Sequence, residues 1–157
     1  MNIRPALVAA LAVLFAGCGQ KASAPAPADS GPREIDITAG DNMKFSITSI
    51  EAKPGEDLKV VLTNVGTAPL EVMGHNWVLL KAGTDANAFS MAAMTSKATN
   101  YIPASHQDDI IAHIDLLGPR KSGEADFKAP STPGDYPFLC SFPAHFQNGM
   151  RGVLTVK

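Results

Sequence analysis

The sequence predicts a single all-β domain, a Greek-key β-sandwich of about eight short strands with one short excursion helix. Apolar residues alternate with polar ones along most of the chain after residue 33. Each alternating run is short and is bounded by Gly, Pro, Asp or Asn, which are turn residues. A chain of 157 residues, of which 45% are hydrophobic and 18% charged, is long enough for one real core.

Alternation with a period of two marks the expected strands in order along the chain. They cover residues 35–37, 43–50, 58–62, 75–79, 109–115, 123–128, 134–140 and 152–157. In the fourth run, the alternation places His75, Trp77 and Leu79 on one face of the strand. Because Trp77 is the only tryptophan and its ring is large and apolar, we expect its side chain in the core.

One segment, residues 84–100, changes character and predicts the helix. It is rich in Ala and Met, which favour helices, and it opens with the capping residues Thr84 and Asp85. The positions that repeat with helical spacing are Phe89, Ala92, Ala93 and Lys97. We therefore expect one helix between the fourth and fifth strands.

The N-terminal residues predict export and a lipid anchor. Residues 1–17 have a basic residue, a short apolar run and small residues, as signal peptides do, and are too short for a comfortable membrane span. Their end, Phe15-Ala-Gly-Cys18, resembles a bacterial lipobox, in which Cys18 carries the lipid; an ordinary cleaved signal peptide is the alternative. Residues 18–33 form a Pro- and Ala-rich linker, and the folded domain spans 34–157. We expect the protein on a bacterial membrane, facing the periplasm.

Composition argues against several classes of partner. The formal net charge is -2 and no block of like charge runs along the chain, so nucleic acid and anionic membrane surfaces are poor partners. The chain also has no internal repeat and no glycine-rich phosphate loop.

Residues 140–150, called the ligand loop below, bring together three side chains that bind metals. Cys140 offers a thiolate, His145 an imidazole and Met150 a thioether, and this soft donor set suits copper better than other common metals. A trigonal copper site needs a second imidazole, and His75 at the start of an apolar strand is the best supplier. Zinc could occupy the same ligands in a preparation starved of copper.

Each of these side chains also has an ordinary structural explanation. A buried cysteine is usually a small apolar residue, a methionine often fills a gap in a core, and a histidine often makes structural hydrogen bonds. The combination in one loop is harder to dismiss. Cys18 is expected to be lipidated or removed, which leaves Cys140 without a disulfide partner, and ligating a metal would give this exported thiol a role.

Four motifs resemble the blue-copper proteins of the cupredoxin family, in particular its azurin-like and auracyanin-like members. They are Met73-Gly-His-Asn-Trp-Val-Leu79, Ile111-Ala-His113, Cys140-Ser-Phe-Pro-Ala-His145 and Met150-Arg-Gly-Val-Leu-Thr-Val-Lys157. The similarity covers residues 34–157 and implies one copper ion that cycles between Cu(I) and Cu(II). The ligands that it implies are His75, Cys140 and His145 in the equatorial plane, Met150 as the weak axial donor and the Gly74 carbonyl as a distant contact.

The resemblance further implies that the backbone N–H groups of Asn76 and Phe142 point at the thiolate sulfur. The sequence also departs from azurins in three places. Four residues separate His145 from Met150, where azurins have three, and this spacing resembles auracyanin. The domain has no cysteine for the N-terminal disulfide of azurins, and Ala144 stands where azurin has a glycine.

The function that the resemblance implies is single-electron transfer between redox proteins, such as cytochromes or copper and haem enzymes, without chemistry on a small-molecule substrate. We expect these partners to dock on an apolar patch around His145. The patch comprises Met43, Met73, Met94, Ala144 and Phe146. A copper chaperone or storage protein is the alternative, although such proteins usually offer clusters of Met or His. An oxidase or nitrite reductase would need several further histidines, and only His106 and His113 remain.

Overall fold

The structure is a computed structural model that describes residues 31–157. The predicted signal peptide, the lipid-attachment residue Cys18 and most of the linker lie outside the described residues. Within residues 31–157, no helix is both long enough and apolar enough to cross a membrane.

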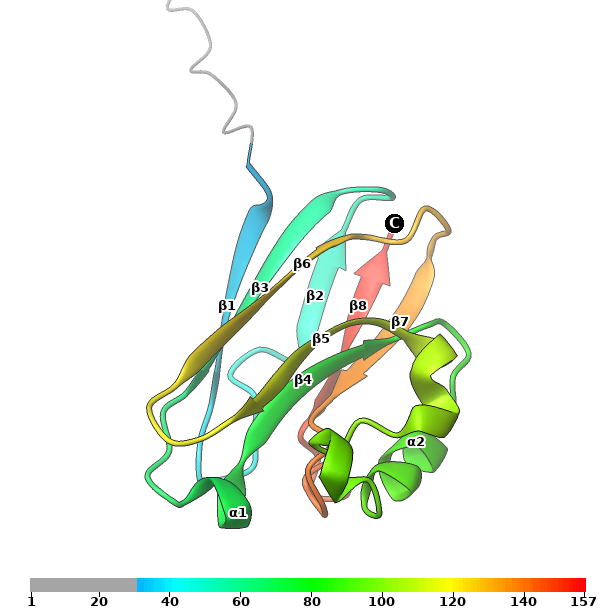
Figure 1. Ribbon diagram of the computed structural model, residues 1–157. Coiled ribbons are helices and arrows are strands. Elements are labelled where there is room, and N and C mark those ends of the chain that lie inside the picture. The colour runs from blue at the N-terminus through cyan, green and yellow to red at the C-terminus, as the bar shows by residue number, and fades with distance from the viewer. Residues whose placement is uncertain (1–30) are drawn as a thin grey trace, which may run out of the picture. The chain divides into compact units, whose positions relative to one another are not determined.

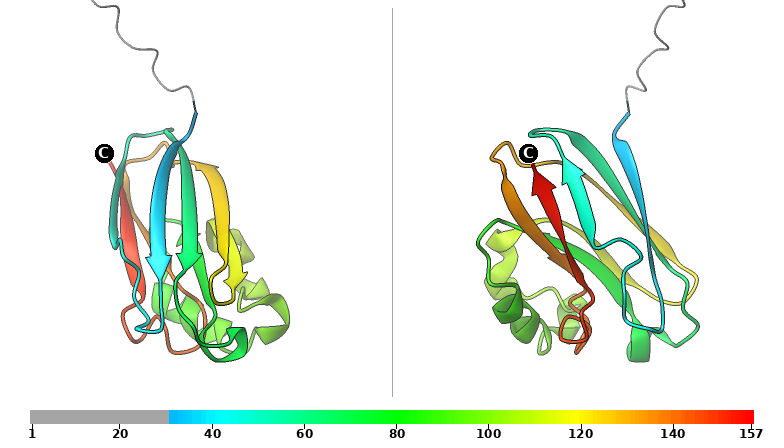
Figure 2. Two further views of the ribbon diagram at one scale, coloured as in Figure 1. Left: turned by 90° about the vertical axis from the view of Figure 1, so that its left-hand side faces the viewer. Right: turned by 180° about the vertical axis from the view of Figure 1, so that it is seen from behind.

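Within residues 31–157, eight strands form two sheets. The two sheets face each other, as Figures 1 and 2 show. The first sheet has the order β1-β3-β6, with β1 (Arg33–Ala39), β3 (Asp57–Asn64) and β6 (Ser122–Lys128). The second has the order β2-β8-β7-β4-β5, with β2 (Ser49–Ala52), β8 (Arg151–Val156), β7 (Gly134–Leu139), β4 (His75–Leu80) and β5 (Ile110–Leu117). β1 pairs with β3, and β2 with β8, in parallel; the other pairs are antiparallel. The predicted all-β sandwich is confirmed.

The main core lies between the two sheets, and the alternation in the sequence produces it. Every second residue of β3 points inward, so Leu58, Val60 and Leu62 are fully buried. Trp77 of β4 is fully buried too, and its ring centroid lies 5.6 Å from that of Phe138. Burying an aliphatic side chain such as that of Leu58 or Val60 stabilises the fold by about 1.5–3 kcal/mol. The prediction that Trp77 lies in the core is confirmed.

Both faces of β4 are buried, because α2 (Ala86–Ala93) covers the face that turns away from the main core (Figure 1). A second apolar cluster fills the space between them. Its members are Val78, Leu80, Phe89, Ile102, Leu139 and Phe146. Asp85 caps α2 as predicted, since its carboxylate accepts hydrogen bonds from the N–H groups of Asn87 (2.9 Å) and Ala88 (3.1 Å).

The helix predicted over residues 84–100 is shorter in the structure, and two short 3-10 helices follow α2. These are η1 (Lys97–Thr99) and η2 (Ala104–Asp109). The Ser96 hydroxyl donates to the Ala92 carbonyl (3.0 Å), a local bond of the kind that competes with the continuing helix. Asn100 and Tyr101 then adopt left-handed φ angles of 52° and 64°, which a right-handed helix cannot contain.

The strand predicted over residues 43–50 is wrong in its first half. Only β2 is a regular strand there, and Phe45 forms an isolated bridge with Ala39. Before Phe45 the chain makes a tight turn, in which Met43 has a φ of 55° and its N–H donates to the Gly40 carbonyl (2.9 Å). The Gly-Asp-Asn sequence favours this turn. The alternation there reflects buried side chains rather than a strand.

The two ends of the sandwich hold different parts of the chain. The ligand end carries the ligand loop, the start of β4 and α1 (Leu70–Met73), a one-turn helix that the sequence did not predict (Figure 1). The far end carries the start of β1 at Arg33 and the last residue, Lys157. β1 runs parallel to β3 from the far end towards the ligand end. The chain therefore begins its first strand at the end opposite to the ligand loop.

Candidate metal centre

Three of the predicted ligands meet at the ligand end. His75 is the first residue of β4, Cys140 directly follows β7, and His145 lies in the ligand loop. Their candidate ligand atoms all lie within 4.8 Å of one another, and the three residues are at most 2% exposed. The other two histidines lie elsewhere and are close to carboxylates: His106 Nδ1 is 2.8 Å from Asp109 Oδ2, and His113 Nε2 is 3.5 Å from Asp115 Oδ1.

Strand register explains why these residues converge. β4 pairs with β7 so that Val78 faces Leu139, and continuing this register brings Asn76 beside Ser141. The two residues are joined side by side: the Ser141 N–H donates to Asn76 Oδ1 (2.8 Å), and Asn76 Nδ2 donates to Ser141 Oγ (2.7 Å). Ser141 Oγ in turn donates to the Tyr101 carbonyl (2.7 Å). This buried network fixes the residues that follow His75 and Cys140, and sequence reasoning missed Ser141 and Tyr101.

The hydrogen bonding of the three side chains fits a metal ion. Within residues 31–157, the only buried side-chain nitrogen or oxygen atoms without a hydrogen-bond partner are both ring nitrogens of His75 and Nε1 of Trp77. A buried polar atom left unpaired costs about 1–3 kcal/mol. Cys140 Sγ lies 3.3 Å from His145 Nδ1, and the two imidazole centroids are 5.0 Å apart. A cation bound between these atoms would supply the partner that His75 lacks.

Burial keeps the candidate ligands uncharged when no metal is bound. It lowers the pKa of His145 to about 4, with a further contribution from the His75 charge, and it also lowers the pKa of His75. The nearby Asp41 carboxylate and Gly40 carbonyl oppose the shift at His75, although Gly40 makes no hydrogen bond of good geometry to the ring. Both imidazoles are therefore neutral at pH 7 and able to donate a lone pair.

The thiol of Cys140 shows the same effect of burial. Its pKa is raised to about 12 by desolvation, and hydrogen bonds from the backbone N–H groups of Asn76 and Phe142 oppose that rise. The thiol is therefore protonated at neutral pH in the metal-free protein. A bound metal would take the thiolate and release one proton from the site. Asn76 and Phe142 are the two residues whose amides the resemblance implied beside this sulfur.

Met150 is fully buried and is tied to both neighbouring ligands through its backbone. Its carbonyl accepts from the Cys140 N–H (3.1 Å), and its N–H donates to the His145 carbonyl (3.0 Å). Gly74 is also buried, and a Cβ there would lie 2.8 Å from the Leu70 carbonyl oxygen. Only glycine fits that position without a shift of α1, so the residue before His75 is sterically constrained.

The predicted docking patch is only partly at the surface. Met94 is 44% exposed, Ala144 is exposed, and Met43 and Met73 are half-buried. Phe146 corrects the prediction, because it is 7% exposed and packs in the second apolar cluster. The turn of the ligand loop directs its ring inward, and the Arg151 guanidinium covers it at 4.8 Å from the ring centroid. Ala144 has a φ of 68°, which explains why a glycine suits this position.

The β-sandwich buries the imidazoles of His75 and His145 and the thiol of Cys140, and the ligand loop also buries the thioether of Met150. This combination of fold and donor atoms defines the class of mononuclear type 1 copper proteins. Residues 33–157 match the family model described as copper binding proteins, plastocyanin/azurin family. The chain belongs to this family of blue-copper electron-transfer proteins. The prediction of one copper ion as the cofactor is confirmed, and so is the resemblance to azurins and auracyanins.

Individual relatives agree with this assignment. Azurin from Pseudomonas fluorescens biotype A is 32% identical over 127 residues, which cover 79% of this chain and 98% of that protein. Auracyanin-A from Chloroflexus aurantiacus is 30% identical over 159 residues, covering 97% and 94%. Auracyanin-B from the same organism is 31% identical over 119 residues, and that match spans 49% of its length. The crystal structure of reduced auracyanin from Roseiflexus castenholzii has a TM-score of 0.71 and 34% identity, covering 81% of this chain and 98% of that one.

Proposed function

We propose that this protein is an exported, lipid-anchored carrier that passes single electrons between redox proteins through one type 1 copper site. The observation that carries the proposal is the buried set of His75, Cys140 and His145, whose ligand atoms lie within 4.8 Å. Copper bound there would supply a one-electron couple between Cu(I) and Cu(II). The nearly complete burial of the ligands supports a carrier over a chaperone or store, which would need an open site to hand over its metal.

Each residue of the site has a distinct role in this proposal. His75, Cys140 and His145 would hold the copper as its three strong ligands, Met150 would add a weak thioether donor, and the Gly74 carbonyl would be a more distant contact. The N–H groups of Asn76 and Phe142 stabilise the thiolate and so tune the potential. The buried bonds between Asn76 and Ser141 keep the ligands in place during the change of charge. A site that does not rearrange exchanges electrons quickly.

Electrons are proposed to pass through His145 at the ligand end. Its neighbour Ala144 is exposed, and Met43, Met73 and Met94 are exposed or half-buried residues that match positions around this ligand in the family. An apolar patch of modest size suits partners that bind briefly and dissociate quickly. Cytochromes and copper or haem enzymes are partners of this kind.

The position of the first strand supports a tether that leaves this patch free. Arg33 begins β1 at the far end, where its Nε donates to Glu56 (2.6 Å) and its Nη2 donates to the Glu51 carbonyl (2.7 Å). A lipid on Cys18 would therefore attach through the end opposite to the ligand loop.

An optical spectrum of the copper-loaded protein tests the proposal. We expect intense blue absorption from charge transfer between thiolate and Cu(II), because Cys140 is the only cysteine of the folded domain. The colour should disappear in Cys140→Ser, while Thr155→Ala, which removes a hydroxyl near the far end that bonds only to Asp135, should keep it. A wild-type protein that contains one copper ion by metal analysis, has been oxidised to Cu(II) and shows only weak cupric absorption would overturn the proposal.

A further inference from the structure

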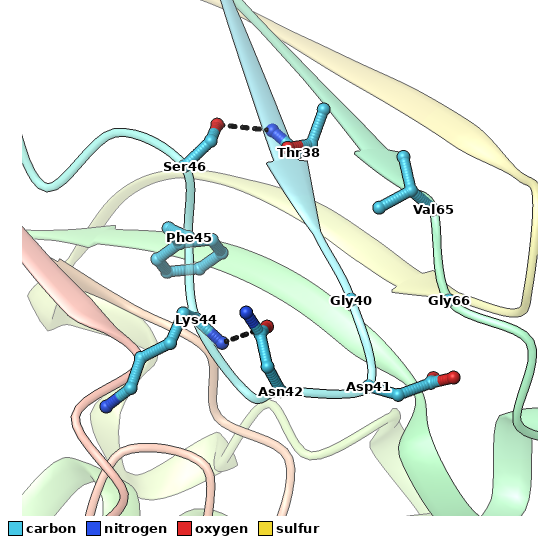
Figure 3. Close-up of a pocket in the computed structure, with 9 residues that line it drawn as sticks. All are labelled: Thr38, Gly40, Asp41, Asn42, Lys44, Phe45, Ser46, Val65 and Gly66. Carbon is cyan, nitrogen blue, oxygen red and sulfur yellow. Dashed lines mark hydrogen bonds between the residues drawn. The ribbon is translucent and has the colours of Figure 1, made fainter.

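The loop over residues 40–46 joins β1 to β2 and has a fixed shape. The Lys44 N–H donates to Asn42 Oδ1 (3.2 Å), and the Thr38 N–H donates to Ser46 Oγ (2.8 Å). Figure 3 shows both bonds and shows the Lys44 side chain extending from the loop on the side away from Asp41. The backbone of Lys44 is thus held, and its side chain is free to reach another element.

That element is the ligand loop. The Lys44 ammonium donates to the carbonyl oxygen of Asn148, 104 residues further along the chain. Asn148 lies between the ligands His145 and Met150. The next residue, Gly149, has a φ of 88°, and a Cβ there would lie 2.8 Å from Lys44 Nζ. Glycine at position 149 therefore provides both the left-handed backbone and the space for the ammonium group.

We propose that Lys44 is a positioning residue for Met150, which it holds in place through the Asn148 carbonyl. The inference rests on the copper site proposed above. Two hydrogen bonds join residues within the ligand loop: the Gly149 N–H donates to the Phe146 carbonyl (2.8 Å), and the Met150 N–H donates to the His145 carbonyl (3.0 Å). They do not attach it to the rest of the domain, whereas the Lys44 bond attaches it to the loop that leaves the first sheet.

The extra loop residue explains why the bond from Lys44 to Asn148 matters for the position of Met150. With four residues between His145 and Met150, the segment has more conformational freedom than a three-residue connection, and ordering each residue costs about 1–2 kcal/mol. On the other side of the loop, Gln147 Nε2 donates to Ser90 Oγ of α2 (3.0 Å). Lys44 and Gln147 therefore hold the longer segment from two sides, and Lys44 acts next to the axial ligand.

The test compares Lys44→Met and Lys44→Arg with a matched control. Lys97→Met removes the same charge from an exposed lysine at the ligand end, near Phe142, and this lysine makes no hydrogen bond to the ligand loop in the described part of the chain. All four proteins should fold, since both lysines are exposed. The reduction potential is a poor readout here, because losing a positive charge lowers it while a weaker thioether contact raises it.

Amide hydrogen exchange in the copper-free proteins is the first readout. In Lys44→Met, exchange at Gly149 and Met150 should accelerate about five- to tenfold, because one hydrogen bond holds the loop closed. Lys44→Arg should retain most of the protection, and Lys97→Met should match the wild type. The second readout is the electron paramagnetic resonance spectrum of the Cu(II) forms, which should change in Lys44→Met only.

These outcomes separate the two proposals. Unchanged exchange and an unchanged spectrum in Lys44→Met, or equal changes in Lys97→Met, would overturn the role of Lys44 and leave the copper site intact. A wild-type protein that bound no copper would overturn the proposed function, while the exchange data would still report whether Lys44 holds the loop.

Discussion

The two ends of the sandwich are held together by different interactions. The far end carries three ion pairs at its surface. These are Arg33–Glu56, Lys128–Asp57 and Lys157–Glu51, each with an N–O distance of 2.6 Å. Their side chains are between 23% and 66% exposed, so each pair contributes at most about 1 kcal/mol. At the ligand end, Asn76 and Ser141 are instead buried and joined by two hydrogen bonds.

The difference shows where this domain tolerates change. A buried hydrogen-bonded pair leaves an unsatisfied group when one member is removed, whereas water replaces the partner of an exposed ion pair. The unpaired ring nitrogens of His75 are a further difference between the two ends. They destabilise the metal-free protein, and they would gain a partner only when a metal ion is bound. Substitutions at the ligand end should therefore have large effects, and the matching substitutions at the far end small ones.

The pH dependence of the copper-free protein should show the largest effect. His145 has its pKa lowered to about 4 by burial, so between that pH and the ordinary value of 6.5 only the unfolded chain binds the proton, and stability rises with pH. Cys140 has its pKa raised to about 12, so above the ordinary value of 9.0 only the unfolded chain loses the proton, and stability falls. Urea unfolding should give a maximum between pH 6.5 and 9.

The control for this prediction lies at the far end. Lys157→Met should leave the shape of the pH profile unchanged, because Lys157 is remote from both titrating groups. A free energy of unfolding that does not change between pH 4.5 and 6.5 in the copper-free wild type would contradict the assignment of a buried, neutral His145.

The next largest effect should be on electron exchange, when a charge is introduced at the docking patch. Met73→Lys places a charge on the half-buried last residue of α1, within the proposed docking patch. We expect exchange with a partner, or between two copies of the protein, to slow by at least about tenfold, because an unpaired charge at the interface costs more than about 1.4 kcal/mol. The blue spectrum should barely change. Stopped-flow or NMR self-exchange rates equal to wild type would place the electron port elsewhere. Val153→Lys, at an exposed position of β8, is the matched control.

Replacement of Met150 should shift the reduction potential without loss of copper. Met150→Leu removes the axial donor and should raise the potential, whereas Met150→Gln supplies a harder oxygen donor that favours Cu(II) and should lower it. Voltammetry of the three proteins gives the order. Equal potentials would mean that Met150, although buried at the site, does not contact the metal.

The sequence was sufficient for features that depend on local pattern. Alternation located most of the strands and placed Trp77 in the core, and the soft donors of the ligand loop indicated copper without knowledge of the fold. Features that depend on register between distant segments could not be predicted. Lys44 and Asn148 are 104 residues apart, and Asn76 meets Ser141 only because of how β4 pairs with β7.

Single backbone angles account for the remaining errors. Met43 has a left-handed backbone, so the alternating run around it is a tight turn and not a strand. Asn100 and Tyr101 are left-handed as well, and they follow a helix that already ends at Ala93. No residue type other than glycine signals such an angle reliably, because asparagine adopts it only at some positions. The inward direction of Phe146 has the same origin, since it depends on the turn that the ligand loop makes.

The smallest predicted difference between the two ends is a difference in stability, between a substitution of Ala144 and one of Lys157. The φ of 68° at Ala144 costs about 1–2 kcal/mol for a residue with a Cβ, while glycine there would lose about 0.5–1 kcal/mol through greater freedom in the unfolded chain. Ala144→Gly should therefore stabilise the domain by about 1 kcal/mol, which thermal or urea unfolding can resolve. Lys157→Met, which breaks an exposed ion pair at the far end, should change stability by less. If Ala144→Gly destabilised the copper-free protein, the left-handed conformation at this position would not be strained, and the ligand loop would owe its shape to contacts around Ala144 instead.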